Sequence, residues 1–208
     1  MIYFSLKYRI IVGLMFFATL GILDLIKNPQ NPKRLKEYGF LFSTVGITML
    51  YGLLHDYITS TISPDYFVLG KGIENATEGF NKDVAILALK ATWSAGLAIG
   101  VAFLLANNPS KIKPQLKFKT LYRLLIYPLL LSVSAAIVLG IIFNLVVLNF
   151  SPPEDDLLSP QSYKLFMTVW GIHIGSYAGG LLGIIVGIVR IRILRARIAK
   201  DALACLKD

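Results

Sequence analysis

Long apolar stretches separated by short polar segments run through the whole chain. Five of them, at 9–26, 38–60, 84–106, 122–148 and 165–189, have about the 20 residues that an α-helix needs to cross the ~30 Å hydrocarbon core of a bilayer. Backbone polar groups cannot stay unpaired in lipid, so such segments are expected to be helical. The pattern therefore predicts an all-α, polytopic transmembrane bundle, one domain spanning 1–208.

Composition supports this prediction and narrows the function classes. The chain is 55% hydrophobic and 16% charged, with a mean hydropathy of +0.65, which is too apolar for a soluble domain. The net charge of +9 lies in short loops and tails, so nucleic-acid binding, which needs a folded basic face, is not expected. Cys205 is the single cysteine, which excludes an internal disulfide and a cysteine metal cluster.

The charge of the connections predicts the orientation of the helices. Segments 27–37, 107–121 and 190–208 are basic, whereas 61–83 and 149–164 are net acidic. The positive-inside rule then places the basic segments in the cytoplasm and predicts an N-out, C-in topology. Lys7 and Arg9 conflict with this, because they would lie outside. If segment 9–26 instead lies on the surface or re-enters, the other four helices keep their orientation.

A weak internal similarity suggests a parallel repeat. Aligning residue 52 with residue 140 pairs Gly52 with Gly140 and Asp56 with Asn144, and it also aligns the Ser-Pro pairs at 63–64 and 151–152. The second and third helices would then be equivalent to the fourth and fifth. The alternative is coincidence among Gly, Ser and Pro at helix ends.

Polar groups of four predicted helices fall at similar depths. At 1.5 Å per residue, His55 and Asp56 lie about 6 to 8 Å below the outer boundary and His173 about 12 Å below it. Ionisable groups inside a membrane are costly and usually face the bundle interior with a partner, so we expect Asp56 to pair with Lys90. The candidate ligand-binding or proton-relay residues are His55, Asp56, Thr59, Lys90, Trp93, Asn144, His173, Ser176 and Tyr177. A purely structural hydrogen-bond network is the alternative.

The stretch "SPDYF" follows the second helix directly and has two interpretations. Asp65, Tyr66 and Phe67 could form a lid over the polar site from outside. Alternatively, the aromatic side chains anchor the chain at the membrane interface, where such residues collect.

Glycine recurs at every fourth position of the fifth helix, at Gly171, Gly175, Gly179, Gly183 and Gly187. Small residues at this spacing let another backbone approach closely. The partner is either a helix of the same chain, with Gly96 and Gly100 as a complementary face, or a second copy or another subunit of a membrane complex.

Two kinds of cofactor are compatible with the candidate residues. His55, Asp56 and His173 form a nitrogen and oxygen set that suits a divalent metal, and two histidines from different helices could also ligate haem. A serine triad is not expected, because "GSYAG" does not match the G-x-S-x-G elbow. The chain has no Walker-type loop or dinucleotide fingerprint.

The strings "HDYIT", "SPDYF", "ATW" and "HIGSY" resemble those of a group of small, functionally uncharacterised bacterial membrane proteins. The resemblance covers the second to fifth predicted helices. It implies a bacterial inner-membrane location and no particular activity.

The preferred hypothesis is an outward-facing intramembrane pocket that binds a small polar solute, an ion or a proton, as in a small transporter or channel. The first alternative is a metal- or haem-dependent membrane enzyme or electron carrier that uses the two histidines. The second is an accessory subunit that docks on a larger complex through the glycine face. Under each hypothesis we expect the protein to be embedded in the lipid bilayer.

Overall fold

A computed structural model describes residues 6–74, 79–110, 112–146 and 158–204, without the side chains of 6–11, 14 and 203. Every regular element in these ranges is a helix: α1 (Leu6–Lys27), α2 (Lys33–Ile62), α3 (Pro64–Lys71), α4 (Phe80–Ala106), α5 (Phe118–Leu124), α6 (Ile126–Val146) and α7 (Pro160–Ala204). Four stretches are long and apolar enough to cross a membrane: α2, α4, α5 with α6, and α7. The prediction of an all-α membrane protein is confirmed to this extent.

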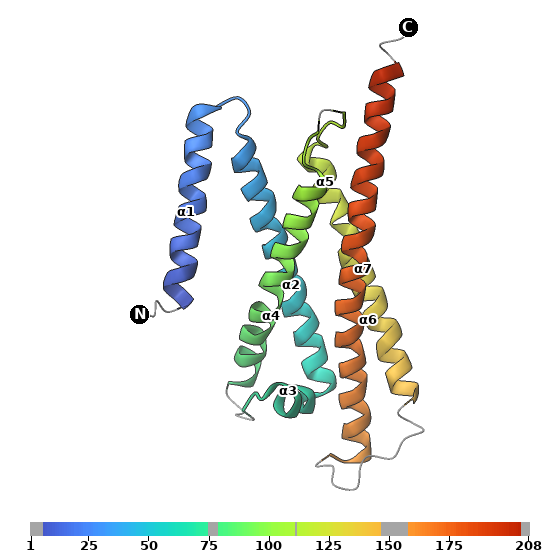
Figure 1. Ribbon diagram of the computed structural model, residues 1–208. Helices are drawn as coiled ribbons and strands as arrows, with labels where there is room; N and C mark the ends of the chain where they lie inside the picture. Colours follow the sequence, from blue (N-terminus) through green and yellow to red (C-terminus); the bar gives the residue numbers. More distant parts are fainter. Residues whose placement is uncertain (1–5, 75–78, 111, 147–157, 205–208) are drawn as a thin grey trace, which may run out of the picture.

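The helices form two tightly packed pairs, α2 with α4 and α6 with α7, and α4 and α7 join the pairs (Figure 1). In the first pair, Gly96 and Gly100 of α4 lie against Thr44 and Thr48 of α2. These two glycines therefore do not supply the complementary face for the glycines of α7. A core of buried side chains, including Phe40, Phe103, Leu121 and Ile191, ties both pairs together.

The regular glycines of α7 face inward, against the same chain. Gly171, Gly175 and Gly179 lie against backbone atoms of α6, and Gly183 lies against Pro128. Gly187 instead lies against the ring of Phe103 on α4. The face is thus filled within one chain, and the structure shows the first of the two alternatives for the glycine pattern.

The first predicted span corresponds to α1, which stands at the edge of the bundle and packs on α2 (Figure 1). The rings of Phe17 and Tyr38 meet edge to face at 5.1 Å. The Asp24 carboxylate accepts a hydrogen bond of 2.7 Å from the backbone N–H of Arg34 in the first turn of α2. A negative charge at a helix N-terminus is stabilising there. α1 is not among the four stretches that are long and apolar enough to cross a membrane. That segment 9–26 crosses the membrane therefore stays a prediction.

Two segments that the sequence predicted to be a loop and a tail are helical in the structure. Residues 64–71 of the predicted outer loop form α3, because Pro64 suits the first helical position and Ser63 caps the helix by accepting from the Tyr66 N–H at 3.3 Å. Gly72, with φ of 68°, ends α3 in the left-handed conformation that glycine favours. In the predicted tail, α7 continues to Ala204, since its Arg, Ile, Leu and Ala residues are helix formers without an intervening Pro or Gly.

The fourth predicted span is one continuous apolar stretch that the structure divides into α5 and α6 around Leu125. Pro128 has no N–H to donate to the carbonyl of Leu124, which explains the interruption.

The two ends of the bundle differ in composition. At one end lie the α1–α2 connection, the segment between α4 and α5, and the C-terminal part of α7; we call this the basic end (Figure 1). There Arg195, only 7% exposed, donates hydrogen bonds to the carbonyls of Ala106, Lys113 and Pro114. These bonds hold the segment between α4 and α5 against α7. The opposite end, which carries α3, is called the α3 end.

Candidate functional site

Two histidines and an aspartate meet near the α3 end of the bundle. His55 and Asp56 lie in the last two turns of α2, and His173 lies on α7. His55 Nδ1 is 2.9 Å from Asp56 Oδ1, and His173 Nε2 is 3.9 Å from the same oxygen. One ligand-type atom from each of the three residues falls within 4.8 Å of the others. The predicted convergence of the two histidines with Asp56 is therefore present in the structure.

The hydrogen-bond network assigns the protons in this cluster. The Thr59 hydroxyl donates to the His55 carbonyl at 2.9 Å, so its oxygen accepts from His173 Nε2–H at 3.4 Å. His55 Nδ1–H donates to Asp56 Oδ1. Both imidazoles thus direct an N–H toward the region of the Asp56 carboxylate. The second nitrogen of His55, Nε2, is buried without a hydrogen-bond partner among the described residues.

The cluster is well shielded. Asp56 is 8% exposed and His173 is 3% exposed. Among the residues that the structure describes, the one further ion pair joins Lys33 to Glu37, far from this cluster in the sequence. In the described part of the chain, the Asp56 carboxylate therefore has two imidazole groups, and no Lys or Arg side chain, within ion-pair distance.

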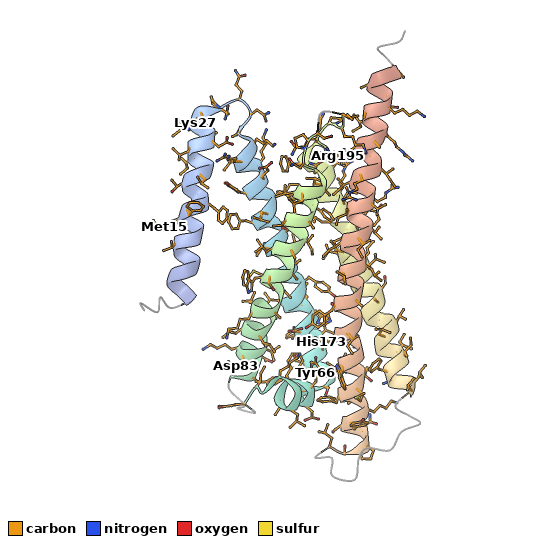
Figure 2. All side chains as sticks on the ribbon, viewed as in Figure 1. Met15, Lys27, Tyr66, Asp83, His173 and Arg195 are labelled. Carbon is orange, nitrogen blue, oxygen red and sulfur yellow. The ribbon has the colours of Figure 1, made fainter. Side chains whose placement is uncertain are left out.

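The short helix α3 covers the cluster at its end of the bundle. The Tyr66 ring stacks on the His173 ring with centroids 4.7 Å apart, and Phe67 approaches His173 edge to face at 5.9 Å. Figure 2 shows Tyr66 and His173 next to each other at this end. Burial, and secondarily the charge of Asp56, raises the pKa of Tyr66 to about 12, so that its hydroxyl stays neutral. Asp65 lies in the first turn of α3, half-buried, with no ion pair or side-chain hydrogen bond in the described chain.

Several predicted site residues lie outside the cluster. Lys90 is exposed and forms no ion pair with Asp56 in the described structure, and Trp93 is 49% exposed. The exposed position of Lys90 on α4 accounts for the absence of the expected pair. Asn144 donates to the Thr168 hydroxyl at 2.9 Å. Tyr177 is 59% exposed, with its ring centroid 6.2 Å from that of His173.

Ser176 belongs to an adjoining polar contact that the sequence did not reveal in full. Its hydroxyl shares a hydrogen bond of 2.8 Å with the hydroxyl of Tyr51. Tyr51 was not among the predicted residues, although its position one turn before His55 on α2 places both side chains on one helix face. The rings of Tyr51 and His55 lie 5.6 Å apart.

The arrangement suits a metal ion and does not suit haem. The His55 and His173 rings meet edge to face with centroids 4.6 Å apart, with the Asp56 carboxylate beside them. Two axial histidines would have to lie on opposite faces of a porphyrin, and this packing leaves no space for a macrocycle between them. Two imidazole nitrogens and a carboxylate oxygen are, by contrast, a common donor set for zinc or non-haem iron.

A groove of about 680 Å³ runs along the outside of the cluster, between α2 on one side and α6 and α7 on the other. Its lining is almost entirely aliphatic, with Leu54 and Ile58 on α2 and Ile137 and Ile141 on α6. His55 and Thr59 also line it, whereas Asp56 and His173 are not among its lining residues.

Comparisons with protein-family models, with curated proteins and with solved structures found no match to this chain. The resemblance to a group of bacterial membrane proteins therefore stays a prediction.

Proposed function

We propose that this protein is an integral membrane protein that binds a divalent transition-metal ion between α2 and α7. The observation that carries the proposal is the convergence of His55, Asp56 and His173 within 4.8 Å, inside helices long and apolar enough to span a membrane. His55 Nδ1, Asp56 Oδ1 and His173 Nε2 are the donor atoms that face one another.

The donor set matches the chemistry of Zn²⁺ or Fe²⁺. Catalytic zinc sites have three protein ligands and keep a further position for water or substrate, and a set of two histidines and a carboxylate with open positions also holds non-haem iron. The metal would take the place of the protons on His55 Nδ1 and His173 Nε2, and each neutral imidazole would then carry its proton on the other ring nitrogen. The Thr59 hydroxyl lies 3.4 Å from His173 Nε2, and it would lose the hydrogen bond from that nitrogen when the metal replaced the proton there.

Electrostatics also favours a bound cation. Placing Asp at the centre of a membrane helix costs roughly 2.5 to 3.5 kcal/mol on insertion scales, and such residues are normally paired. Asp56 has no Lys or Arg partner in the described chain, and the two imidazoles are its nearest charged or chargeable groups. A dication would offset the negative charge more fully than two neutral imidazoles.

The burial of the cluster favours a held metal over the transported polar solute of the first hypothesis. Tyr66 and Phe67 close the α3 end, with 4% and 0% exposure. The large groove beside the cluster presents mainly apolar surface, although polar side chains such as Tyr51, Asn144 and Thr168 also line it. A metal-dependent membrane protein, the alternative hypothesis from the sequence, accounts for both features.

We further propose that the basic end faces the cytoplasm and the α3 end faces outward, in a bacterial inner membrane. Support comes from the three basic segments, which gather at one end of the bundle (Figure 1). With α1 as a fifth span this gives the N-out, C-in topology. The pairing of α2 with α4 and of α6 with α7 also fits the proposed parallel repeat.

Metal analysis of the purified protein tests the proposed function. The wild type should carry one equivalent of zinc or iron, or take up one equivalent of Zn²⁺ after chelation and dialysis. Asp56→Asn keeps the shape and removes the charge, and it should weaken Zn²⁺ binding by about tenfold or more. Asn144→Leu, which removes a polar side chain at the same end but outside the cluster, is the matched control and should bind normally. A folded wild type that neither contains nor takes up stoichiometric metal would refute the proposal.

A further inference from the structure

We propose that the groove between α2, α6 and α7 holds the acyl chain of a membrane lipid, and that the His55 site is reached from the bilayer. The groove measures about 680 Å³, and its walls are the aliphatic side chains of the three helices. Such a volume is in the range of pockets that bind small molecules. The question is which ligand fits an aliphatic groove inside a membrane-spanning bundle.

The position of the groove indicates the hydrocarbon phase. Its lining on α6 extends from Val133 to Leu145, which is about 18 Å of helix. This is close to the depth of one leaflet, since the hydrocarbon core is about 30 Å thick. The groove begins near the middle of α6 and runs toward the α3 end, so it follows the direction of an outer-leaflet acyl chain in the proposed topology.

The rim of the groove is open to the surroundings of the bundle. Leu54 and Ile58 on α2 are each 57% exposed, and on α6 Ile137 and Ile141 are 57% and 55% exposed. In a membrane these side chains meet lipid, so an acyl chain can enter sideways. At the α3 end, Ser63, Tyr66 and Phe67 are buried, with exposure between 0% and 4%.

One nitrogen of the groove-lining residue His55 lacks a hydrogen-bond partner, and this indicates which polar group a ligand should carry. The other polar side chains of the lining are engaged: Asn144 with Thr168, Tyr51 with Ser176, and Thr59 with the His55 carbonyl. His55 lines the groove, but its Nε2 is buried and has no partner in the described structure, so a groove ligand would reach this atom only after a shift of the His55 ring. Leaving a buried polar group unpaired is unfavourable. We therefore infer that the preferred chain carries a hydroxyl or carbonyl oxygen partway along its length.

This inference deepens the proposed function and rests on it only for the state of His55. With a metal on Nδ1, Nε2 bears the proton and donates to the ligand oxygen. Without a metal, Nε2 accepts from a hydroxyl. In either state the ligand oxygen lies beside the cluster, so the metal site and the lipid site adjoin at His55.

Photo-crosslinking tests the lipid site. The full-length protein is reconstituted in phosphatidylglycerol nanodiscs that contain a small fraction of the same lipid with a diazirine midway along one acyl chain. We expect labels concentrated on groove residues such as Leu54 and Ile58, at several times the level of Leu130 and Leu182, which are as exposed but lie outside the groove. Equal labelling of both sets would overturn the proposal, because it would show only the ordinary lipid surroundings.

A matched pair of variants sharpens this test. Ile141→Trp fills the groove and should lower the labelling of Leu54 and Ile58 several-fold, whereas Ile142→Trp, at a neighbouring exposed position outside the lining, should leave it unchanged. If both variants, or neither, reduce the labelling, the groove is not the binding site. Folding of each variant is checked by its helical circular dichroism.

Competition experiments test the oxygen and separate this proposal from the metal proposal. A fatty acid with a mid-chain hydroxyl should displace the photoreactive lipid about 2- to 10-fold better than the unsubstituted acid of the same length, because it gains one hydrogen bond. This advantage should vanish in His55→Phe, and its absence in the wild type would refute the role of Nε2. Groove labelling without any bound metal would sustain the lipid site while refuting the metal proposal, and bound metal without groove labelling would do the reverse.

Discussion

Replacing Gly179 with alanine should destabilise the protein, because the added methyl group has no space between α6 and α7. A Cβ at this position would collide with the carbonyl group of Leu131 and approach the Cβ of Ala135 to 2.9 Å. The first obstacle is helix backbone, which cannot move aside as a flexible side chain could. The two helices would therefore have to separate along their contact.

The magnitude follows from comparison with a second glycine. Gly46 lies on α2, and a Cβ there would meet nothing within 4 Å. Both substitutions gain about the same helix propensity, up to about 1 kcal/mol, so this contribution cancels in the difference. What remains is the overpacking at Gly179, for which about 1 to 3 kcal/mol is typical. For a protein of this length, that is a difference in Tm of about 2 to 12 °C.

Thermal unfolding in a mild detergent, followed by circular dichroism, measures this difference. Gly46→Ala should unfold at or above the temperature of the wild type, and Gly179→Ala clearly below it. Equal Tm values for the two variants would refute the close packing of α7 on α6. That result would reopen the alternative in which the glycines face a second copy of the chain.

Other contacts give further expectations. Arg195→Met removes the hydrogen bonds to three carbonyls and should lower the free energy of unfolding by about 1.5 to 3 kcal/mol. We expect a protease to cleave the variant faster than the wild type within 108–117, and unchanged cleavage would contradict this. Gly72→Ala forces alanine into the left-handed region at the end of α3 and should cost about 1 kcal/mol, seen as faster hydrogen exchange in 64–71. Asp24→Ala removes the acceptor at the N-terminus of α2 and should lower the Tm, whereas an unchanged Tm would show that the bond contributes nothing.

The long apolar helices were predictable because their signal is carried by long apolar runs of sequence. Four of the five predicted spans coincide with helices of the structure that are long and apolar enough to cross a membrane. Counting the rise per residue also placed His55, Asp56 and His173 at similar depths, and the structure brings them together. Depth follows from the rise per residue, which is the same in every helix.

What the sequence could not supply is the direction in which each side chain points. Lys90 has the expected depth, but helix rotation leaves it exposed, so the pair with Asp56 does not form. Tyr51 was missed for the converse reason, since an aromatic residue in an apolar helix gives no signal of the partner that it meets on α7. The glycine spacing predicted a close helix contact, but spacing alone cannot tell a helix of the same chain from that of another.

The proposed function requires that His55, Asp56 and His173 together hold one metal ion. X-ray absorption spectroscopy of the zinc-loaded protein tests it most directly, because the spectrum reports the ligand types. We predict nitrogen and oxygen ligands at about 2.0 to 2.2 Å with the multiple-scattering signature of two imidazoles, and in His173→Gln the signature of one. A zinc spectrum without imidazole scattering, or one that His173→Gln leaves unchanged, would contradict the account.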